Sequence, residues 1–178
     1  MQLETEPITQ LIDRLAAVVP NYPEPGISFK DLTPVFADGQ GFHRIVDAIV
    51  DPFRGTFDVI AGLEARGFIL ASAAAYATGT GMLTIRKKGK LPRETLAESY
   101  QLEYGEATLE VHRDDVPTGT RVLVLDDVLA TGGTLDASTK LIERAGGIVV
   151  GIGVVLELED LGGRGRLSGR HVHSLSAV

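Results

Sequence analysis

The stretch that decides the fold is Val122-Leu123-Val124-Leu125-Asp126-Asp127-Val128-Leu129-Ala130-Thr131-Gly132-Gly133-Thr134. It opens with a short apolar run of the kind expected for a strand buried on both faces. Two adjacent carboxylates and a Thr-Gly-Gly-Thr turn come next, and the apolar spacing after the turn predicts a helix that ends at Gly146-Gly147. The sequence therefore predicts a strand, an acidic tip, a glycine turn and a helix in direct succession.

Such a junction suits a phosphorylated sugar. The first turn of a helix has unpaired N–H groups and the positive end of the helix dipole, and glycines let an anion approach the backbone closely. Thr131 and Thr134 can donate hydroxyl hydrogen bonds to the same phosphate. Asp126 and Asp127 would repel a phosphate, so we expect them either to accept hydrogen bonds from sugar hydroxyls or to hold a metal ion. The alternative is a buried strand with an acidic turn and no ligand, since short glycine motifs often match by chance.

Length and composition indicate one globular domain. The chain has 178 residues, of which 44% are apolar and 23% are charged, as is ordinary for a single domain with a full-sized core. It has no cysteine, so disulfides and thiolate metal sites are excluded. Its net charge of −7 argues against a nucleic-acid-binding protein. We find no apolar run of membrane-spanning length and no leader, and therefore expect a cytoplasmic protein.

Predicted strands alternate with predicted helices along the chain. Apolar runs predict strands at 57–63, 82–85, 121–125, 148–156 and 171–175, and helical spacing predicts helices at 8–19, 42–53, 68–76 and 135–142. The proline-rich residues 22–34 predict an irregular, stiff segment, and the polar residues 91–115 predict a long loop or a mobile hairpin. Alternation of this kind implies a parallel sheet with right-handed crossovers, which binds ligands beyond the carboxyl ends of its strands.

Two further polar segments follow predicted strands. Glu64-Ala65-Arg66-Gly67 could bind an anion through backbone N–H groups and the Arg66 guanidinium. A run of basic residues follows the next strand, although such a charge run is more often only a solvated surface. Its members are Arg86, Lys87, Lys88, Lys90 and Arg93. Beside a helix-start phosphate site, both segments are better explained as contacts for a pyrophosphate group.

The complete run from Val122 to Thr134 resembles the phosphoribosyl-pyrophosphate signature of the type I phosphoribosyltransferases. Three more segments, at 22–34, 85–92 and 99–105, resemble the base-binding segment, pyrophosphate strand and flexible loop of one branch, the adenine phosphoribosyltransferases. Four segments in matching order are much more specific than one motif. The resemblance implies a type I α/β fold with a central, mostly parallel twisted sheet, helices on both faces, a small N-terminal hood and a flexible loop over the site.

The same resemblance implies an organisation and a reaction. Residues 1–178 would be a single domain, with the hood at about 1–40 and the flexible catalytic loop at about 91–115. The reaction would be purine salvage, in which adenine and 5-phosphoribosyl 1-pyrophosphate give AMP and pyrophosphate. Mg²⁺ would be bound with the pyrophosphate substrate rather than by a protein metal site. The protein would be a homodimer with no nucleic-acid or membrane partner.

Roles for individual residues also come from the resemblance. The donor 5-phosphoribosyl 1-pyrophosphate would be bound by Arg66, Lys87, Lys90, Asp126, Asp127, Ala130, Thr131, Gly132, Gly133 and Thr134. Within this set, residues 130–134 would hold the 5′-phosphate, the aspartates the ribose hydroxyls, and the cations the pyrophosphate. Adenine would be bound by Ser28, Phe29, Lys30 and Val128, with Phe29 and Val128 on the two faces of its ring. Glu103 would act as general acid or base for the proton on the imidazole nitrogens of adenine. The Ala65-Arg66 peptide bond would be cis.

Other functions stay open at this point. A transferase for a 6-oxopurine or for orotate is a close alternative, although the base-binding segment and the Glu103 loop weigh against it. A purine-responsive regulator would need a nucleic-acid-binding domain or a basic face, and a synthase that makes the donor would need an ATP site. His171-Val172-His173 could begin a metal site, but no further cysteine or histidine lies nearby. Residues 156–164, which resemble the family's C-terminal segment, are predicted to be structural.

Overall fold

The computed structural model describes residues 6–101 and 105–178. These residues form two compact units, residues 1–48 and residues 49–178, and each unit is described by itself. The first unit contains α1 (Ile8–Leu15), β1 (Ala17–Pro20), β2 (Ser28–Asp31), α2 (Thr33–Ala37) and most of α3 (Gly39–Val50). Its strands β1 and β2 pair in an antiparallel ribbon, with Val19 opposite Phe29.

The first predicted helix was too long. Helix α1 ends at Leu15, and the next residue, Ala16, already has extended backbone angles (φ −64°, ψ 144°). Val18 and Val19 pair with β2 instead of continuing the helix, in agreement with the preference of β-branched side chains for strands. The segment at 22–34, predicted to be irregular throughout, is also partly regular, because it contains β2 and the beginning of α2.

The second unit is built on a seven-stranded sheet with the order β5-β6-β4-β3-β7-β8-β9. Strands β4, β3, β7, β8 and β9 are parallel, and β5 and β6 form an antiparallel hairpin at one edge. The strands are β3 (Val59–Leu63), β4 (Gly81–Lys87), β5 (Thr95–Gln101), β6 (Glu106–His112), β7 (Arg121–Leu129), β8 (Ile148–Glu157) and β9 (Val172–Ala177). The predicted mostly parallel sheet is therefore confirmed, and so is a hairpin within 91–115.

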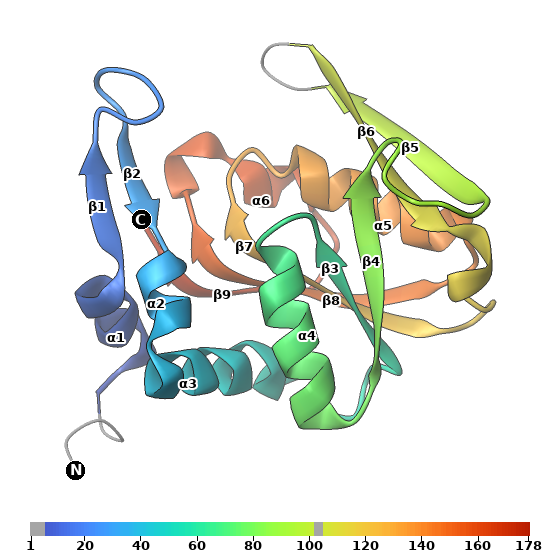
Figure 1. Cartoon of the computed structure of the whole chain (residues 1–178), viewed down its shortest axis with the longest axis horizontal. Coiled ribbons are helices and arrows are strands. Elements are labelled where there is room, and N and C mark those ends of the chain that lie inside the picture. The colour runs from blue at the N-terminus through green and yellow to red at the C-terminus, as the bar shows by residue number, and fades with distance from the viewer. Residues whose placement is uncertain (1–5, 102–104) are drawn as a thin grey trace. The chain divides into compact units, whose positions relative to one another are not determined.

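Helices cover both faces of this sheet. Helix α4 (Gly67–Thr78) connects β3 to β4, and α5 (Gly133–Arg144) connects β7 to β8, so the two crossovers run in opposite directions from the centre. Right-handed crossovers that diverge in this way place their helices on opposite faces, and Figure 1 shows α4 in front of the sheet and α5 behind it. The point where the strand order diverges, between β3 and β7, is where ligands bind in such sheets.

The second unit also contains short helical turns, two of them between β8 and β9. They follow β8 as η3 (Glu159–Leu161) and α6 (Gly163–Arg166), and two other short turns are η1 (Asp51–Phe53) and η2 (Arg113–Asp115). Among the described residues, no helix combines the length and apolar character needed to span a membrane.

The core of the second unit is packed closely enough to exclude single methyl groups. A Cβ atom on Gly151 of β8 would lie 2.1 Å from Cε1 of Phe53, and Phe53 is 1% exposed. We expect Gly151→Ala to lower the free energy of unfolding by about 1–3 kcal/mol, as overpacked cores do. Urea unfolding would measure this decrease in the free energy of unfolding. Gly81→Ala in β4 is the control, because its Cβ would meet only Val59 Cγ2 at 3.4 Å; equal losses in both variants would contradict the overpacking.

Strand β7 is longer than predicted. The sequence suggested that the strand ends at Leu125, but β7 continues to Leu129 and pairs with β8 as far as Glu157. Val128 and Leu129 extend the apolar strand beyond the carboxylates, so Asp126 and Asp127 lie within the strand rather than on a tip after it. Neighbouring strand residues point in opposite directions, and the two carboxylates therefore have different surroundings.

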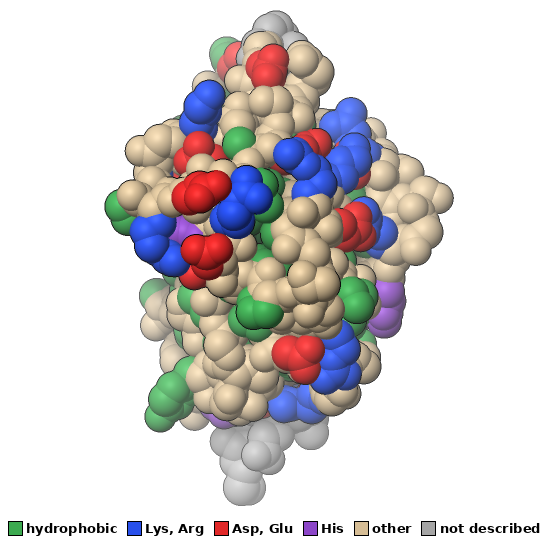
Figure 2. All heavy atoms as spheres, turned by 90° about the vertical axis from the view of Figure 1, so that its right-hand side faces the viewer, with side chains coloured by type: hydrophobic (Ala, Val, Ile, Leu, Met, Phe, Trp, Pro, Cys, Tyr) green, Lys and Arg blue, Asp and Glu red, His purple; other side chains and the backbone are tan. Residues whose placement is uncertain are grey.

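Charged side chains on the outer surface are mixed in sign. Figure 2 shows basic and acidic side chains lying beside one another across one face of the molecule. Exposed ion pairs of this kind in the second unit include Arg93–Asp115, Arg113–Glu94 and Arg121–Asp58. Each exposed pair contributes little to stability, but each also neutralises a cation that would otherwise attract anions.

Candidate functional site

A pocket lies where β7 passes into α5. It is lined by Asp126, Val128, Ala130, Thr131, Gly132, Gly133, Thr134 and Leu135. These residues are the last part of β7, the turn after it and the start of α5, which is the junction that the sequence singled out. The structure thus brings together the predicted phosphate loop and the first of the two predicted ribose carboxylates.

The phosphate loop depends on its glycines. Gly132, the residue before α5, has φ +78°, a conformation that glycine adopts readily and other residues do not. A Cβ atom on Gly132 would lie 2.6 Å from the carbonyl oxygen of Gly163, and one on Gly163 would lie 2.1 Å from the carbonyl oxygen of Ala130. The loop and the C-terminal segment therefore pack backbone against backbone. This leaves the N–H groups at the start of α5 available to an anion.

The adjacent carboxylates differ in their partners. Oδ2 of Asp127 lies 2.7 Å from Nε of Arg66, and Asp127 is 6% exposed. Asp126 lines the pocket, and its Oδ1 accepts a hydrogen bond from the Asp127 backbone N–H at 2.9 Å. Burial raises the pKa of Asp126 well above its ordinary value, and the charge of Asp127 raises it further. Burial also raises the pKa of Asp127, although the Arg66 guanidinium opposes that shift.

The physical consequence is a pair of carboxylates short of hydrogen-bond donors. Two buried negative charges are costly unless donors or cations surround them. Sugar hydroxyls would supply such donors to Asp126, whereas Arg66 already serves Asp127. The predicted pyrophosphate residue Arg66 is thus brought to the carboxylate pair.

The basic segment after β4 gathers around Glu64, at the end of β3. The Glu64 carboxylate accepts hydrogen bonds from Lys90 Nζ at 2.8 Å, Arg86 Nη2 at 3.1 Å and the Lys87 backbone N–H at 3.1 Å. The bond from Lys90 contributes most to holding the pKa of Glu64 down at about 2, and Arg86 adds to it. Lys87 and Lys90 remain exposed. Glu64 therefore fixes this loop, while the side chains of Lys87 and Lys90 stay exposed to solvent.

We expect Glu64→Gln to destabilise the protein at neutral pH. The pKa of Glu64 is lower in the folded protein than its ordinary 4.5, so its contribution to stability is present above pH 4.5 and is lost as the pH falls toward about 2. The melting temperature of Glu64→Gln should lie below that of the unmodified protein at about pH 7, and the gap should narrow on acidification. Glu94→Gln breaks an exposed pair with Arg113 and should leave the melting temperature unchanged at both pH values. If the difference in melting temperature between Glu64→Gln and the unmodified protein did not change with pH, the ionic cause would be contradicted.

The cis bond lies one position earlier than expected. The non-proline cis peptide bond is Glu64–Ala65, so the expected position, Ala65–Arg66, was wrong. Arg66 already has helical backbone angles (φ −75°, ψ −25°) as the residue before α4, and the turn out of β3 is therefore made before it. Tyr22–Pro23 in the first unit is also cis.

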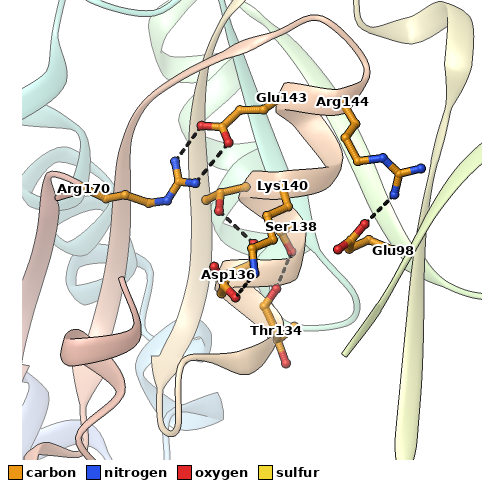
Figure 3. A network of polar contacts seen from close by, with 9 residues as sticks. Glu98, Thr134, Asp136, Ser138, Lys140, Glu143, Arg144 and Arg170 are labelled. Atoms are coloured by element: carbon orange, nitrogen blue, oxygen red, sulfur yellow. Dashed lines mark hydrogen bonds and ion pairs between the residues drawn. The ribbon is translucent and has the colours of Figure 1, made fainter. Parts of the chain in front are cut away.

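Helix α5 and the β5–β6 hairpin are joined near the pocket. Thr134 Oγ1 donates a hydrogen bond to the Tyr100 hydroxyl at 3.1 Å, so the end of β5 lies against the phosphate loop. Figure 3 shows the other anchors of α5, with Arg144 reaching Glu98 of β5 on one side and Glu143 receiving Arg170 on the other. Helix α5 is therefore held at its first turn by Tyr100 and at its last turn from both sides. Glu103, the predicted catalytic residue, lies outside the described residues.

The predicted adenine-binding residues are divided between the two units. Val128 lines the pocket in the second unit. Ser28, Phe29 and Lys30 form β2 of the first unit, where the Phe29 ring contacts the Tyr22 ring edge-on at a centroid distance of 5.3 Å. The Lys30 ammonium lies 2.5 Å from the Asp13 carboxylate, so its side chain has a protein partner and only its backbone keeps the predicted role. The adenine contacts stay a prediction.

Some residues at the pocket were not predicted. Gly163 packs on the loop, Tyr100 bonds to Thr134, and Arg166 reaches Gly133. Tyr100 lies in the segment at 99–105 that resembles the family's flexible loop, and Gly163 lies in residues 156–164, which resemble the family's C-terminal segment and were assigned a structural role. His171 packs against the Phe53 ring at a centroid distance of 4.7 Å. No cluster of three or more potential metal ligands occurs within the parts of the chain that the structure describes.

Comparisons with known proteins agree with this geometry. The sequence model of the family described as "Phosphoribosyl transferase domain" matches residues 38–170. The adenine phosphoribosyltransferase of Renibacterium salmoninarum is 64% identical over 170 residues, which cover 96% of this chain and 93% of the relative. That of an Arthrobacter species is 62% identical, covering 95% of this chain and 91% of the relative.

Solved structures give the same result. The crystal structure of adenine phosphoribosyltransferase from Rhodothermus marinus superposes with a TM-score of 0.90 at 45% identity, covering 96% of this chain and 98% of that one. The Saccharomyces cerevisiae structure, solved with an imino-altritol bisphosphate and adenine, has a TM-score of 0.89 at 34% identity and covers 94% and 98% of the two chains. By sequence and by structure, this chain belongs to the adenine phosphoribosyltransferases, within the type I phosphoribosyltransferase family.

Proposed function

We propose that the pocket between β7 and α5 is where this enzyme binds 5-phosphoribosyl 1-pyrophosphate and transfers its ribosyl group to adenine. The enzyme converts adenine and 5-phosphoribosyl 1-pyrophosphate to AMP and pyrophosphate. The observation that carries the site assignment is the pocket lining, in which the half-buried carboxylate of Asp126 stands next to a glycine loop at the start of a helix. A phosphorylated ribose needs both groups side by side.

Each residue has a physical role in this proposal. The N–H groups of residues 130–134 hold the 5′-phosphate. The Thr131 hydroxyl donates to it as well, and so does the Thr134 hydroxyl in place of its bond to Tyr100. Asp126 and Asp127 accept hydrogen bonds from the ribose hydroxyls. The anomeric carbon becomes positively charged as pyrophosphate leaves, as in other oxocarbenium-like transfers. Nearby carboxylates favour that charge.

Cations stabilise the leaving group, pyrophosphate. Arg66, Lys87 and Lys90 stabilise the negative charge that develops on pyrophosphate. In this proposal the metal enters the pocket with the substrate, beside the Asp126 carboxylate that lines it. Mg²⁺ bound through the pyrophosphate oxygens would neutralise part of their charge.

The nucleophile is N9 of adenine. In the proposal, Ser28, Phe29, Lys30 and Val128 bind the base, and Glu103 takes up or supplies the proton on its imidazole nitrogens. Closure of the loop that carries Glu103 keeps water from hydrolysing the activated ribose. A direct test mixes the protein with the donor, Mg²⁺ and one base at a time. AMP should form with adenine, while turnover with hypoxanthine or orotate instead of adenine would overturn the base assignment.

Glu103→Ala tests the proposed proton transfer. Because general acid–base groups contribute typically about 10²–10⁴-fold, we expect kcat to fall within that range while the affinity for the donor stays unchanged. Glu106→Ala, three residues further along and exposed at the start of β6, is the matched control and should retain activity. An unchanged kcat in Glu103→Ala would remove this residue from the mechanism.

A homodimer is part of the same proposal. Helix α4 is apolar on nearly all sides, and Tyr76 is 92% exposed with Ile69 at 42% on the same helix. Positions seven apart lie on one helix face, so these side chains form one apolar stripe that a second subunit would cover. Light scattering should give twice the chain mass, and Tyr76→Arg should shift the protein toward monomer; a monomeric unmodified protein would contradict the dimer.

We also propose that the enzyme acts in the cytoplasm. Its donor and its product AMP are both phosphorylated, and such charged molecules cross membranes poorly. Fractionation of cells that produce the protein should place activity in the cytoplasmic fraction, and activity confined to another fraction would contradict this location.

A further inference from the structure

Arg166 lies beside the start of α5. A Cβ atom on Gly133, the first residue of that helix, would be 2.9 Å from Nη1 of Arg166 and 3.2 Å from the Tyr100 ring. Arg166 is the last residue of α6, and its side chain is exposed. One guanidinium therefore reaches the phosphate loop from a segment more than thirty residues further along the chain.

The segment that carries Arg166 is firmly held. Arg164, two residues earlier, binds the buried Glu157 at the end of β8 through Nε at 2.8 Å, and it also donates to Ser174 Oγ at 3.0 Å and to the Val172 carbonyl at 3.1 Å. Leu167, the next residue, is 1% exposed. Since Arg164 and Leu167 are both fixed, the fold places the backbone of Arg166 within side-chain reach of the loop.

The charge of Arg166 is unusual for its place. Other arginines around α5 and α6 are matched by carboxylates, as Figure 3 shows for Arg144 with Glu98 and for Arg170 with Glu143. Within residues 6–101 and 105–178, no carboxylate forms an ion pair with Arg166. A cation at the positive end of a helix dipole is disfavoured. An anion bound between the Arg166 guanidinium and the start of α5 would attract both and so replace this repulsion with attraction.

The phosphate loop itself lacks a cation. Residues 130–134 are Ala-Thr-Gly-Gly-Thr, so the loop offers only neutral donors to a phosphate monoester that carries about −1.5 to −2 charges. The neighbouring carboxylate of Asp126 would repel that charge. A guanidinium next to Gly133 would supply both the missing positive charge and strong, charge-assisted hydrogen bonds.

We propose that Arg166 is a further binding residue for the 5′-phosphate of 5-phosphoribosyl 1-pyrophosphate and of AMP. The inference rests on the proposed function of the loop as the 5′-phosphate site. It assigns to the C-terminal segment a direct part in substrate binding, with Arg164 and Glu157 as positioning residues.

Calorimetric titration with ribose 5-phosphate and, separately, with pyrophosphate tests the proposal. Arg166→Gln should weaken ribose 5-phosphate binding about tenfold, the loss expected for one charged hydrogen bond, and should leave pyrophosphate binding unchanged. Arg166→Lys keeps the charge without the fork and should recover part of the affinity. Arg170→Gln, the matched control four residues on, removes the same charge from a pair with Glu143 and should leave both affinities unchanged.

The outcomes separate the inference from the proposed function. Equal ribose 5-phosphate affinity in Arg166→Gln and the unmodified protein would overturn the role of Arg166 and leave the loop assignment intact. Equal weakening of ribose 5-phosphate and pyrophosphate would also overturn it, because it would indicate a general loss of positive charge. An unmodified protein that binds pyrophosphate but not ribose 5-phosphate would overturn the loop assignment itself, and the role of Arg166 with it.

Discussion

Gly132→Ala should remove most of the transferase activity. Alanine at this position would have to adopt φ near +78°, and its Cβ would lie 2.6 Å from the carbonyl oxygen of Gly163, which is backbone and cannot rotate away. The loop must therefore shift, and the N–H groups that would meet the 5′-phosphate shift with it. We expect kcat/KM to fall by about 100-fold or more, equivalent to roughly 2.7 kcal/mol. Steady-state kinetics with varied donor concentration would measure the loss.

Gly55→Ala is the matched control for this variant. Gly55 has the same φ of +78°, but a Cβ atom there would meet nothing within 4 Å. It therefore carries the strain of a left-handed residue, about 1–2 kcal/mol of stability, without displacing a loop. The control should keep its activity while its melting temperature falls. If Gly132→Ala retained kcat/KM like the control, the loop would not be the 5′-phosphate site.

The parts of the site that the sequence predicted are those made from consecutive residues. Asp126 and the loop from Ala130 to Thr134 line one pocket because a strand, a tight turn and a helix start follow one another directly. Hydrophobic runs and glycine pairs are local signals, and they determine such a junction whatever surrounds it. The mostly parallel sheet was predictable for the same reason, since strands alternate with helices along the chain.

The parts that could not be predicted depend on contacts between distant residues. Strand β7 continues past its carboxylates because it pairs with β8 as far as Glu157, and that pairing has no signature within β7 itself. The packing of Gly163 on Ala130, and the approach of Arg166 to Gly133, join residues about thirty positions apart. In β1, pairing with β2 overrode a helical spacing that extended to Val19. Tertiary contacts decide such cases, and local propensity does not.

Asp126→Asn should make the protein more stable and much less active. Burial and the charge of Asp127 raise the pKa of Asp126, which means that the folded protein disfavours the ionised carboxylate. Asparagine removes that cost and can still accept the hydrogen bond from the Asp127 backbone N–H. We expect the melting temperature at about pH 7 to rise by roughly 2–4 °C, the shift for about 1 kcal/mol in a chain of this size. Loss of a charged hydrogen bond to a ribose hydroxyl should lower kcat/KM by about 10- to 100-fold.

The pH dependence of this gain identifies its cause. A carboxyl group whose pKa is raised on folding stabilises the folded state at pH values below its pKa in the unfolded chain, which is 3.8 for Asp126. This stabilisation is lost as the pH rises through the pKa of the folded state. The difference in melting temperature between Asp126→Asn and the unmodified protein should therefore grow as the pH rises above 3.8. Asp58 is the opposite case, because hydrogen bonds from Arg121 lower its pKa to about 2. Asp58→Asn should lose stability at neutral pH without a change in kcat/KM. A stability loss in Asp126→Asn as well would mean that ionised Asp126 stabilises the fold, and that its carboxylate has no cost in stability.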